Sequence, residues 1–397
     1  MDKEIGYRDN MVEDNNREDI DDFIPIIGSG TVGSYLGYLL AKKGYNVTLY
    51  EDHDKIGVPC HCTGIVTSSL LEIIDLVKLK KELIINRLKK VKVVAPNNDY
   101  TILKSTDIVL DRVGFDVFLA ELATDQGAKL EYNHKFLSFD AQKNELKLKN
   151  KENIKTINCS KVIGADGPNS ALYPLVNPTV KREPWIGVQV VIKGDFDKEM
   201  YEAYLGSEFA PGFFAWVVPE NEESAIVGLA TKEKTNFYFE KFMRQRCGEN
   251  WKANVQSYRG GLIPLYNKKV ACEKEGVFLV GDAAGHVKAT TGGGIIPGMK
   301  AAQALADSFK SGKNQGINYG YDKLWRKYTG KDLWMHLKIR ETMNKFHDKD
   351  YNYLVSLMNK EKTHTLMEKS DREYPSKFIL KMLAAEPRFL YFMKHLF

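Results

Sequence analysis

The hydrophobic pattern of residues 23–52 predicts a strand, a turn, a helix and a second strand. An apolar run from Phe23 to Ile27 precedes glycines at positions 28, 30 and 33. A second apolar run, Val47 to Tyr50, then ends at Glu51. This glycine spacing allows a tight turn, a close approach of backbone to phosphate and close packing of the helix on the sheet. The pattern predicts a dinucleotide site, with Glu51 about 20 residues downstream as a ribose ligand. A purely structural βαβ turn is the alternative.

Pro25 stands inside the first apolar run, where it removes a ladder hydrogen bond. We therefore expect the strand to start after Pro25 or to be irregular at its beginning.

The remaining pattern alternates between helical and strand-like segments. It predicts helices over residues 67–90, 111–127 and 297–309, and throughout the chain from Tyr319 onward. Strands are predicted over 91–103, 129–138, 144–149, 161–164, 188–192, 213–218, 225–229, 258–264 and 276–282.

These elements predict an α/β fold with an inserted antiparallel sheet and a helical C-terminal region. Residues 1–21 are expected to form an acidic leader. The nucleotide-binding domain is expected to comprise 22–90, 104–175 and 265–325. A substrate domain of antiparallel strands is expected to comprise 91–103 and 176–264, and the C-terminal helices 326–397.

The composition is that of an ordinary globular protein, with 43% hydrophobic and 27% charged residues among 397. The net charge of +5 is unevenly spread, because residues 1–22 carry nine acids against three bases and residues 321–397 carry sixteen bases against ten acids. An acidic leader and a basic, aromatic tail do not resemble a nucleic-acid-binding protein. The tail is compatible with an anionic membrane surface or with a solvated helical face.

The five cysteines show no paired spacing, and no signal peptide follows Met1. We therefore expect a reducing, cytoplasmic environment. The segment Cys60-His61-Cys62 lacks the second pair of ligands that a zinc site needs, so we predict no metal. The long uncharged run from Phe23 to Ala41 is better explained by the strand, turn and helix than by a membrane span.

Two further glycine motifs follow predicted strands, GADGPNS at residues 164–170 and VGDAAG at 280–285. Asp282 ends a buried strand just before a helix, where an acid can accept a hydrogen bond from a ribityl hydroxyl. Together with the first turn, these motifs resemble the FAD-binding fold of the para-hydroxybenzoate hydroxylase and glutathione reductase type. That resemblance implies FAD as cofactor, held by Gly28, Gly30, Gly33, Ser34, Glu51, Cys62, Thr63, Arg112, Asp166, Gly167, Asp282, Gly294 and Ile295.

Four other stretches resemble the geranylgeranyl reductase family. Residues 211–219 resemble its P-x-x-Y/F-x-W-x-F/V-P signature, residues 56–62 its I-G-x-P-x-x-C loop, residues 291–295 its T-G-G-G-I turn and residues 260–264 its G-G-x-x-P element. The resemblance covers roughly residues 22–325. Thr31 replaces the family's usual proline and Phe214 its commoner tyrosine, so the details of substrate contact differ.

This resemblance implies a reductase that saturates isolated C=C bonds of polyprenyl chains, such as those of ether glycerophospholipids. The apolar set Phe213, Phe214, Trp216 and Val218 is expected to line a hydrocarbon channel, although an ordinary half-buried strand would look the same. Cys62 is the expected source or tuner of the proton, against the alternative of a small loop cysteine, and Tyr258 is a weaker candidate.

Two rival functions remain at this point. A flavin monooxygenase or halogenase is one, although halogenases carry W-x-W-x-I-P and this chain has only Trp216 in that element. An electron-transfer flavoprotein is the other, although its cysteines lack cluster spacing. NAD(P)H, a ferredoxin or a deazaflavin are all open as electron donor. The apolar, basic tail fits an interfacial helix at the cytoplasmic face of a membrane, or a cap on the substrate domain.

Overall fold

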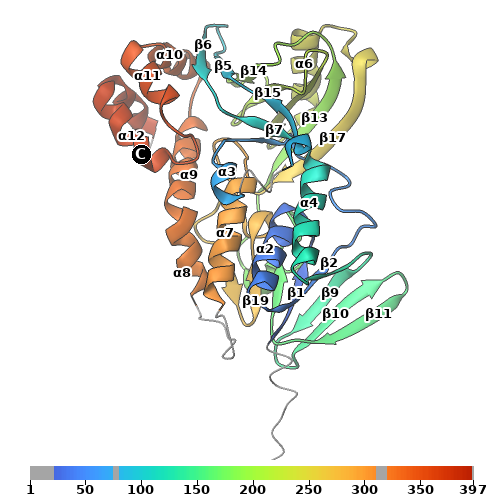
Figure 1. Cartoon of the computed structure of the whole chain (residues 1–397). Helices are drawn as coiled ribbons and strands as arrows, with labels where there is room; N and C mark the ends of the chain where they lie inside the picture. Colours follow the sequence, from blue (N-terminus) through green and yellow to red (C-terminus); the bar gives the residue numbers. More distant parts are fainter. Residues whose placement is uncertain (1–21, 75–79, 310–319, 396–397) are drawn as a thin grey trace, which may run out of the picture.

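The computed structural model describes residues 22–74, 80–309 and 320–395. One sheet has seven strands. Figure 1 shows this sheet, which includes β13, β15 and β17, at one end of the molecule, the nucleotide-binding sheet with its helices at the other, and the C-terminal helices along one side. The predicted acidic leader lies outside the described residues.

The nucleotide-binding sheet has six strands in the order β18-β19-β12-β1-β2-β8, parallel except for β18. Short runs of Ile and Val, buried on both faces, suit a parallel sheet. Helices α2, α4 and α7 lie side by side against it (Figure 1). The elements are β1 (Phe23–Ile27), α2 (Thr31–Lys42), β2 (Asn46–Tyr50), α4 (Arg112–Asp125), β8 (Lys129–Glu131), β12 (Val162–Gly164), β18 (Glu273–Lys274), β19 (Val277–Leu279) and α7 (Ile295–Ser308).

Both expectations for Pro25 are wrong. Strand β1 starts at Phe23 and pairs with β2 in unbroken register through Pro25. The amide of Ala165 donates to the Ile27 carbonyl. The backbone N–H and C=O groups of the odd-numbered residues of β1 therefore point toward β12. Because β12 pairs only from Ile26 onward, the missing N–H of Pro25 lies beyond that ladder and costs it no hydrogen bond.

The second large sheet is mainly antiparallel, in the order β17-β13-β16-β15-β14-β5-β6, with one parallel pair between β14 and β5. Helix α6 (Thr235–Cys247) packs on one face through Phe239, Phe242 and Met243. The opposite face is turned toward the nucleotide-binding sheet. Its strands are β5 (Lys90–Val94), β6 (Tyr100–Lys104), β13 (Trp185–Lys193), β14 (Met200–Tyr204), β15 (Ala215–Pro219), β16 (Ser224–Thr231) and β17 (Val255–Ile263).

The helix predicted over 67–90 is wrong in its second half. Residues 75–79 lie outside the described residues. Of the described part of this range, only α3 (Leu70–Ile73) and a short 3-10 turn (Lys81–Leu83) are helical, and residues 84–87 form β4. The pair Ile84-Ile85 is β-branched, and β4 finds a partner in β7 (Ile108–Leu110), which also pairs with β3 (Ile65–Val66). Tertiary pairing thus overrides the helix-forming lysines and leucines around it.

The remaining short elements connect the sheets. A three-stranded meander of β9 (Lys135–Asp140), β10 (Glu145–Asn150) and β11 (Asn153–Asn158) projects beside the nucleotide-binding sheet (Figure 1). The short helix α5 (Tyr173–Val176) and 3-10 turns at Trp251–Asn254 and Gly281–Ala284 complete this part.

The C-terminal helices cap the edge of the seven-stranded sheet. They are α8 (Tyr321–Trp325), continued by a π-helical turn (Arg326–Gly330) into α9 (Lys331–Met343), then α10 (Asp348–Met358), α11 (Glu361–Glu368), α12 (Pro375–Ala385) and a 3-10 segment (Pro387–His395). Val355 and Met358 pack against Leu103 in one apolar cluster. The ring of His364 donates to the Ile102 carbonyl (2.8 Å), so α11 also binds the edge strand β6.

Candidate cofactor and substrate site

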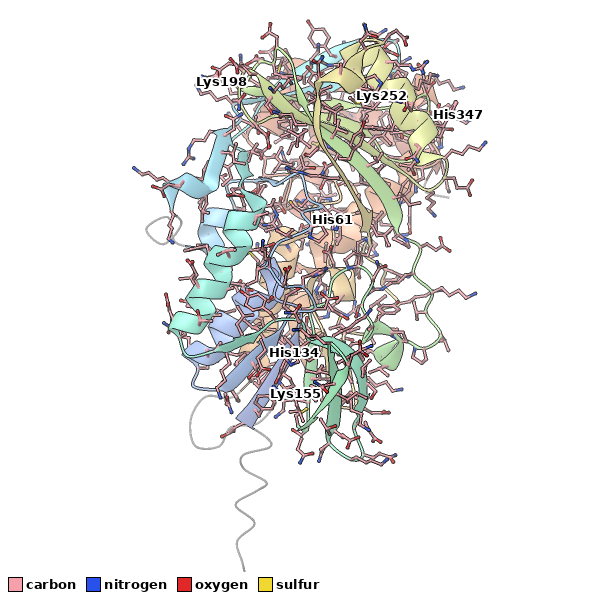
Figure 2. All side chains as sticks on the ribbon, turned by 90° about the vertical axis from the view of Figure 1, so that its right-hand side faces the viewer. His61, His134, Lys155, Lys198, Lys252 and His347 are labelled. Atoms are coloured by element: carbon pink, nitrogen blue, oxygen red, sulfur yellow. The ribbon has the colours of Figure 1, made fainter. Side chains whose placement is uncertain are left out.

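A cavity of about 1380 Å³ lies between the two large sheets. One part is bounded by the first glycine turn and the end of β2, and another runs under the seven-stranded sheet. His61 lies midway between the sheets, whereas His134 lies lower, beside the nucleotide-binding sheet (Figure 2). Both residues line the cavity, so it extends along the whole space between them.

The first glycine turn leaves the backbone close to this cavity. A Cβ on Gly28, which has φ +97°, would lie 2.5 Å from the Ala165 carbonyl oxygen, and one on Gly33 would lie 2.0 Å from the Gly28 oxygen. A Cβ on Gly30 would meet nothing within 4 Å, although Gly30 lines the cavity. The open space beside Gly30 is what a pyrophosphate needs to approach the helix N-terminus. Gly33 and Ser34 do not line the cavity; the Ser34 hydroxyl donates to the Ser29 carbonyl (2.7 Å) and shapes the turn.

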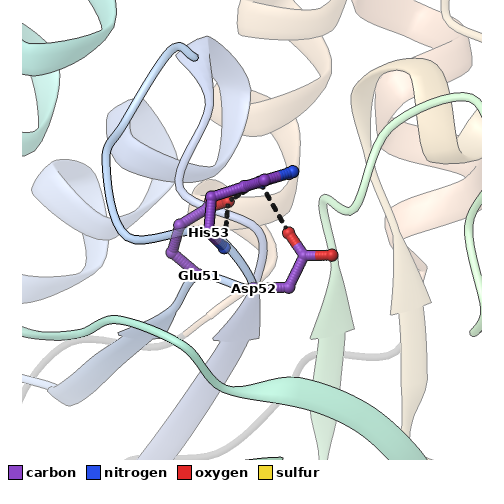
Figure 3. A group of neighbouring side chains, drawn as sticks. All are labelled: Glu51, Asp52 and His53. Carbon is purple, nitrogen blue, oxygen red and sulfur yellow. Dashed lines mark hydrogen bonds and ion pairs between the residues drawn. The ribbon is translucent and has the colours of Figure 1, made fainter. Parts of the chain in front are cut away.

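Glu51 follows β2 directly (Figure 3), and it lines the cavity. Its Oε2 accepts hydrogen bonds from the amide (3.0 Å) and hydroxyl (2.8 Å) of Ser29, and its Oε1 contacts His53 Nδ1 at 2.7 Å. Burial opposes its charge, but the hydrogen bonds from Ser29 and His53 lower the pKa of Glu51, so it is an ionised acceptor. Its bond to His53 in turn raises the pKa of that imidazole.

Asp52 also contacts His53 Nδ1, at 2.8 Å, so Glu51, Asp52 and His53 form one cluster (Figure 3). Their potential ligand atoms lie within 4.8 Å of one another. Because the imidazole already bridges the two carboxylates, we interpret the group as an ion-pair cluster that orients Glu51 and propose no metal there.

Arg112 places a fixed cation beside the glycine turn. Its Nη2 donates to Thr31 Oγ1 (2.7 Å) and Asp116 (3.1 Å), whereas Nε and Nη1 are buried and have no hydrogen-bond partner in the described part of the chain. Burial alone would lower the pKa of Arg112, but Asp116 and the thiols of Cys62 and Cys60 raise it above its usual value. A buried guanidinium with unused N–H groups at a cavity wall fits an anionic phosphate. Thr31, at the family's usual proline position, takes part in this arrangement.

The second and third motifs bring two carboxyl groups to the same cavity. Asp166 Oδ2 accepts from the Ala171 amide (2.7 Å), while Oδ1 is buried and unpartnered among the residues described. Asp282 faces Gly294, where a Cβ would lie 2.7 Å from its Oδ1. Burial raises the pKa of Asp282 to about 6, partly offset by Arg182 and Arg112. Gly167 and Ile295 also line this part, so the residues present fit the hydroxyls and ring system of a flavin nucleotide.

The loop around Cys62 lines the cavity between the cofactor side and the seven-stranded sheet. Cys62 is exposed, and its sulfur accepts a hydrogen bond from the Gly64 amide at 3.4 Å. Cys60 donates to the Cys62 carbonyl (3.7 Å), and burial raises the pKa of the Cys60 thiol. Thr63 binds Gln189 through its hydroxyl (2.8 Å). Cys62, the expected proton donor, therefore has open access to the cavity.

The predicted apolar set forms one continuous surface, which we call the aromatic wall; it consists of Phe213, Phe214, Trp216 and Val218. Phe213 stacks on Phe214 with ring centroids 4.8 Å apart, and Phe214 meets Trp216 edge-on at 5.7 Å. Val218 follows on β15, and all four side chains line the cavity. These residues form an apolar surface that faces the Cys62 loop.

The expectation for Tyr258 is wrong. Its side chain is 63% exposed on β17 and does not line the cavity. Side chains alternate along a strand, and a Cβ on Gly261, three residues later, would point at His61. Tyr258 therefore points to the opposite face and cannot donate a proton to a substrate in the cavity.

The comparisons with known proteins agree with this geometry. The sequence profile described as "FAD binding domain" matches residues 22–311. The chain belongs to the FAD-binding domain family. This flavoprotein is a flavin-dependent oxidoreductase with FAD as its cofactor, and the predicted fold class is confirmed.

The flavoprotein is 28% identical to digeranylgeranylglycerophospholipid reductase 2 of Methanothermobacter thermautotrophicus, over 84% of this chain and 90% of that protein. It is also 28% identical to the digeranylgeranylglycerophospholipid reductase of Methanothrix thermoacetophila, over 94% and 98%. The predicted resemblance to geranylgeranyl reductases is confirmed.

Solved structures share the fold of this flavoprotein. A geranylgeranyl bacteriochlorophyll reductase-like protein of Thermoplasma acidophilum superimposes with a TM-score of 0.76 at 24% identity, covering 94% of this chain and 98% of that one. The flavin-dependent halogenase CmlS reaches 0.64 at 15% identity, covering 93% and 77%.

The structure adds cavity-lining residues that the sequence did not single out. Six of the seven strands contribute, all except β16, and the C-terminal helices supply a further wall. We call the apolar part under the sheet the hydrocarbon arm; it is lined by Val91, Val93, Leu103, Ala203, Trp216, Val218, Met358, Met367 and Phe378. No local signal distinguishes the methionines from ordinary helix-packing residues. Within the described ranges, no helix is long and apolar enough to cross a membrane.

Proposed function

We propose that this flavoprotein saturates isolated C=C bonds of geranylgeranyl chains, carried on ether glycerophospholipids. The observation that supports this most is the continuity of one cavity from the nucleotide-binding turn into the hydrocarbon arm. The arm runs under β15, β14, β5 and β6, three inter-strand steps of about 4.8 Å, or about 14 Å, and the cavity continues under β13 and β17 on the cofactor side. The apolarity of the arm suits a polyprenyl chain, and the relatives' names specify such a substrate.

The ends of the hydrocarbon arm differ in chemistry, which supports an orientation of the lipid. The cofactor side carries the Cys62 loop, whereas the β6 end is lined by polar residues 104–107 and 368–372. There Arg372 donates to Asp107 and to the Tyr201 hydroxyl (2.6 Å). We propose that the polar head of the lipid lies at this end and that the prenyl chain extends toward Cys62.

Bound FAD supplies the hydride for one alkene carbon when it is reduced. The protein's own contribution is to bind the chain without polar competition, to exclude water along the aromatic wall and to deliver a proton to the other carbon. We propose that the Cys62 thiol donates this proton, because the thiol is exposed on the loop that lines the cavity. Water then reprotonates the thiolate. The external electron donor is proposed to be NAD(P)H, a ferredoxin or a reduced deazaflavin.

The C-terminal helices support a peripheral contact with the membrane that holds the lipid. Phe378 on α12 lines the cavity, while Leu380, two residues later, is 74% exposed. Lys377 and Lys381 flank it and are exposed as well. An exposed apolar side chain between basic ones is typical of an interfacial helix, so we propose that α12 meets an anionic lipid surface.

The proposed function is tested with protein reduced by dithionite and incubated without oxygen with a geranylgeranyl ether lipid. Mass spectrometry is expected to show products heavier by two hydrogens for each saturated bond. Cys62→Ala is expected to lower single-turnover saturation at least tenfold, whereas Cys247→Ala, on α6 and outside the cavity lining, serves as the matched control. Unchanged lipid in the wild-type reaction would refute the proposal, and full activity of Cys62→Ala would refute the role of the thiol.

A further inference from the structure

Gln189 lies on β13, the strand next to the edge strand β17 of the seven-stranded sheet. On β13 it pairs with Gly228 of β16 on one side and with Arg259 of β17 on the other. Its side chain is 3% exposed and lines the cavity. A Cβ on Gly228 would lie 2.5 Å from the Gln189 Cβ and 2.9 Å from Trp216 Cε2, so a glycine at 228 is needed to accommodate this pair of side chains.

The amide of Gln189 joins the Cys62 loop to the aromatic wall. Thr63 Oγ1 (2.8 Å) and Trp216 Nε1 (3.3 Å) both donate to Gln189 Oε1, and Gln189 Nε2 donates to the His61 carbonyl (3.2 Å). The amide orientation is fixed by chemistry, because an indole N–H only donates and a carbonyl only accepts. One buried side chain thus holds the residues immediately before and after Cys62.

We propose that Gln189 is a positioning residue that fixes the Cys62 thiol opposite Trp216 and so sets where a substrate carbon meets the proton donor. The chemical role of Cys62 rests on the proposed function, whereas the hydrogen bonds of Gln189 do not. Without the amide, His61 and Thr63 lose an anchor in a loop that is otherwise open to the cavity. Loss of a buried partner is expected to loosen that loop more than it destabilises the sheet.

The test compares Gln189→Leu with Gln303→Leu in FAD-loaded protein. Gln303 is a matched control, because it also donates one hydrogen bond, to the Tyr35 hydroxyl (2.9 Å), but does not line the cavity. Alkylation of Cys62 by iodoacetamide, followed by mass spectrometry with fragment ions that distinguish Cys62 from Cys60, is expected to become about tenfold faster in Gln189→Leu and to change less than about twofold in Gln303→Leu. Equal rates in the two variants would overturn the proposal.

A second variant separates hydrogen bonding from packing. In Gln189→Glu the buried carboxyl has a raised pKa, and its protonated form donates to the His61 carbonyl as the amide does. The ratio of its Cys62 alkylation rate to that of wild type is therefore expected to be near 1 at about pH 5.5 and to rise severalfold by about pH 8. A ratio that does not depend on pH would overturn the proposal. In the case that Gln189→Leu does not retain FAD, the Gln189→Glu ratio is the deciding measurement. If the alkylation rates change as expected while wild-type protein reduces no prenyl lipid, the positioning role stands and the proposed function fails.

Discussion

Arg340 offers the sharpest test of how the C-terminal helices support the cofactor site. It lies on α9, is 2% exposed, and donates from Nε to the Ala289 carbonyl (2.9 Å), from Nη1 to Gly212 (2.7 Å) and from Nη2 to Thr290 (2.6 Å). Ala289 and Thr290 lead directly into the 291–295 turn that lines the cavity. Replacing Arg340 with Met removes all three donors while keeping an unbranched apolar side chain.

The magnitude follows from two opposing contributions. Hydrogen bonds from a charged donor contribute about 1.5–3 kcal/mol each, so three give roughly 5–9 kcal/mol. Against this, burial lowers the pKa of Arg340 to about 10 from its usual 12.5. That difference of about 2.5 pH units corresponds to about 3 kcal/mol against the buried charge. We therefore expect Arg340→Met to lower the free energy of unfolding by about 4 kcal/mol.

The assay is urea unfolding of the apo-protein, together with titration of FAD by fluorescence quenching. Because the 291–295 turn loses its support, the Kd for FAD is expected to rise about tenfold. Arg244→Met is the control, since Arg244 lies on α6 with 58% of its side chain exposed and is expected to cost less than about 0.5 kcal/mol. A loss below about 1 kcal/mol in Arg340→Met, with unchanged FAD affinity, would refute the reasoning.

Three further predictions concern the cofactor side, the hydrocarbon arm and α12. Asp282 has a folded-state pKa near 6, above the ordinary 3.8, so its ionisation penalty is absent below about pH 4 and complete above about pH 6. Asp282→Asn is therefore expected to raise the free energy of unfolding of the apo-protein in urea by up to about 3 kcal/mol at pH 8, and to leave it unchanged at pH 4. The same substitution is expected to weaken FAD binding. Equal stability effects at both pH values would contradict this. The double variant Met358→Trp with Met367→Trp is expected to shorten the hydrocarbon arm. Turnover of geranylgeranyl chains is therefore expected to fall about tenfold more than turnover of geranyl chains. An equal fall in turnover for both chain lengths would contradict this. Lys377→Glu with Lys381→Glu is expected to weaken flotation with anionic vesicles at least tenfold, while zwitterionic vesicles show little binding to either protein; unchanged flotation would remove α12 from the membrane contact.

The nucleotide-binding half was largely predictable because its signals are local. The glycine spacing, the acid at position 51 and the strand-to-turn junctions at 166 and 282 each follow from a short stretch of chain. The backbone geometry then restricts positions 28 and 33 to glycine, because a Cβ at either position would clash with backbone atoms.

The substrate half was predictable only where a motif happened to mark it. The role of Gln189 depends on the register of β13 with β16 and β17, which joins residues far apart in the sequence. The error over Tyr258 has the same origin, since strand parity decides which face a side chain occupies. Met358, Met367 and Arg340 act through tertiary packing, for which helical periodicity gives no partner.

The central claim is that a geranylgeranyl lipid enters the hydrocarbon arm and is saturated there. Stopped-flow absorbance, without oxygen, of reduced flavoprotein mixed with a geranylgeranyl ether lipid tests this most directly. We predict that the absorbance of oxidised flavin returns at a rate that rises with lipid concentration, with one bond saturated for each flavin reoxidised. Flavin that stays reduced with the lipid, and reoxidises only when oxygen or a quinone is added, would contradict the account.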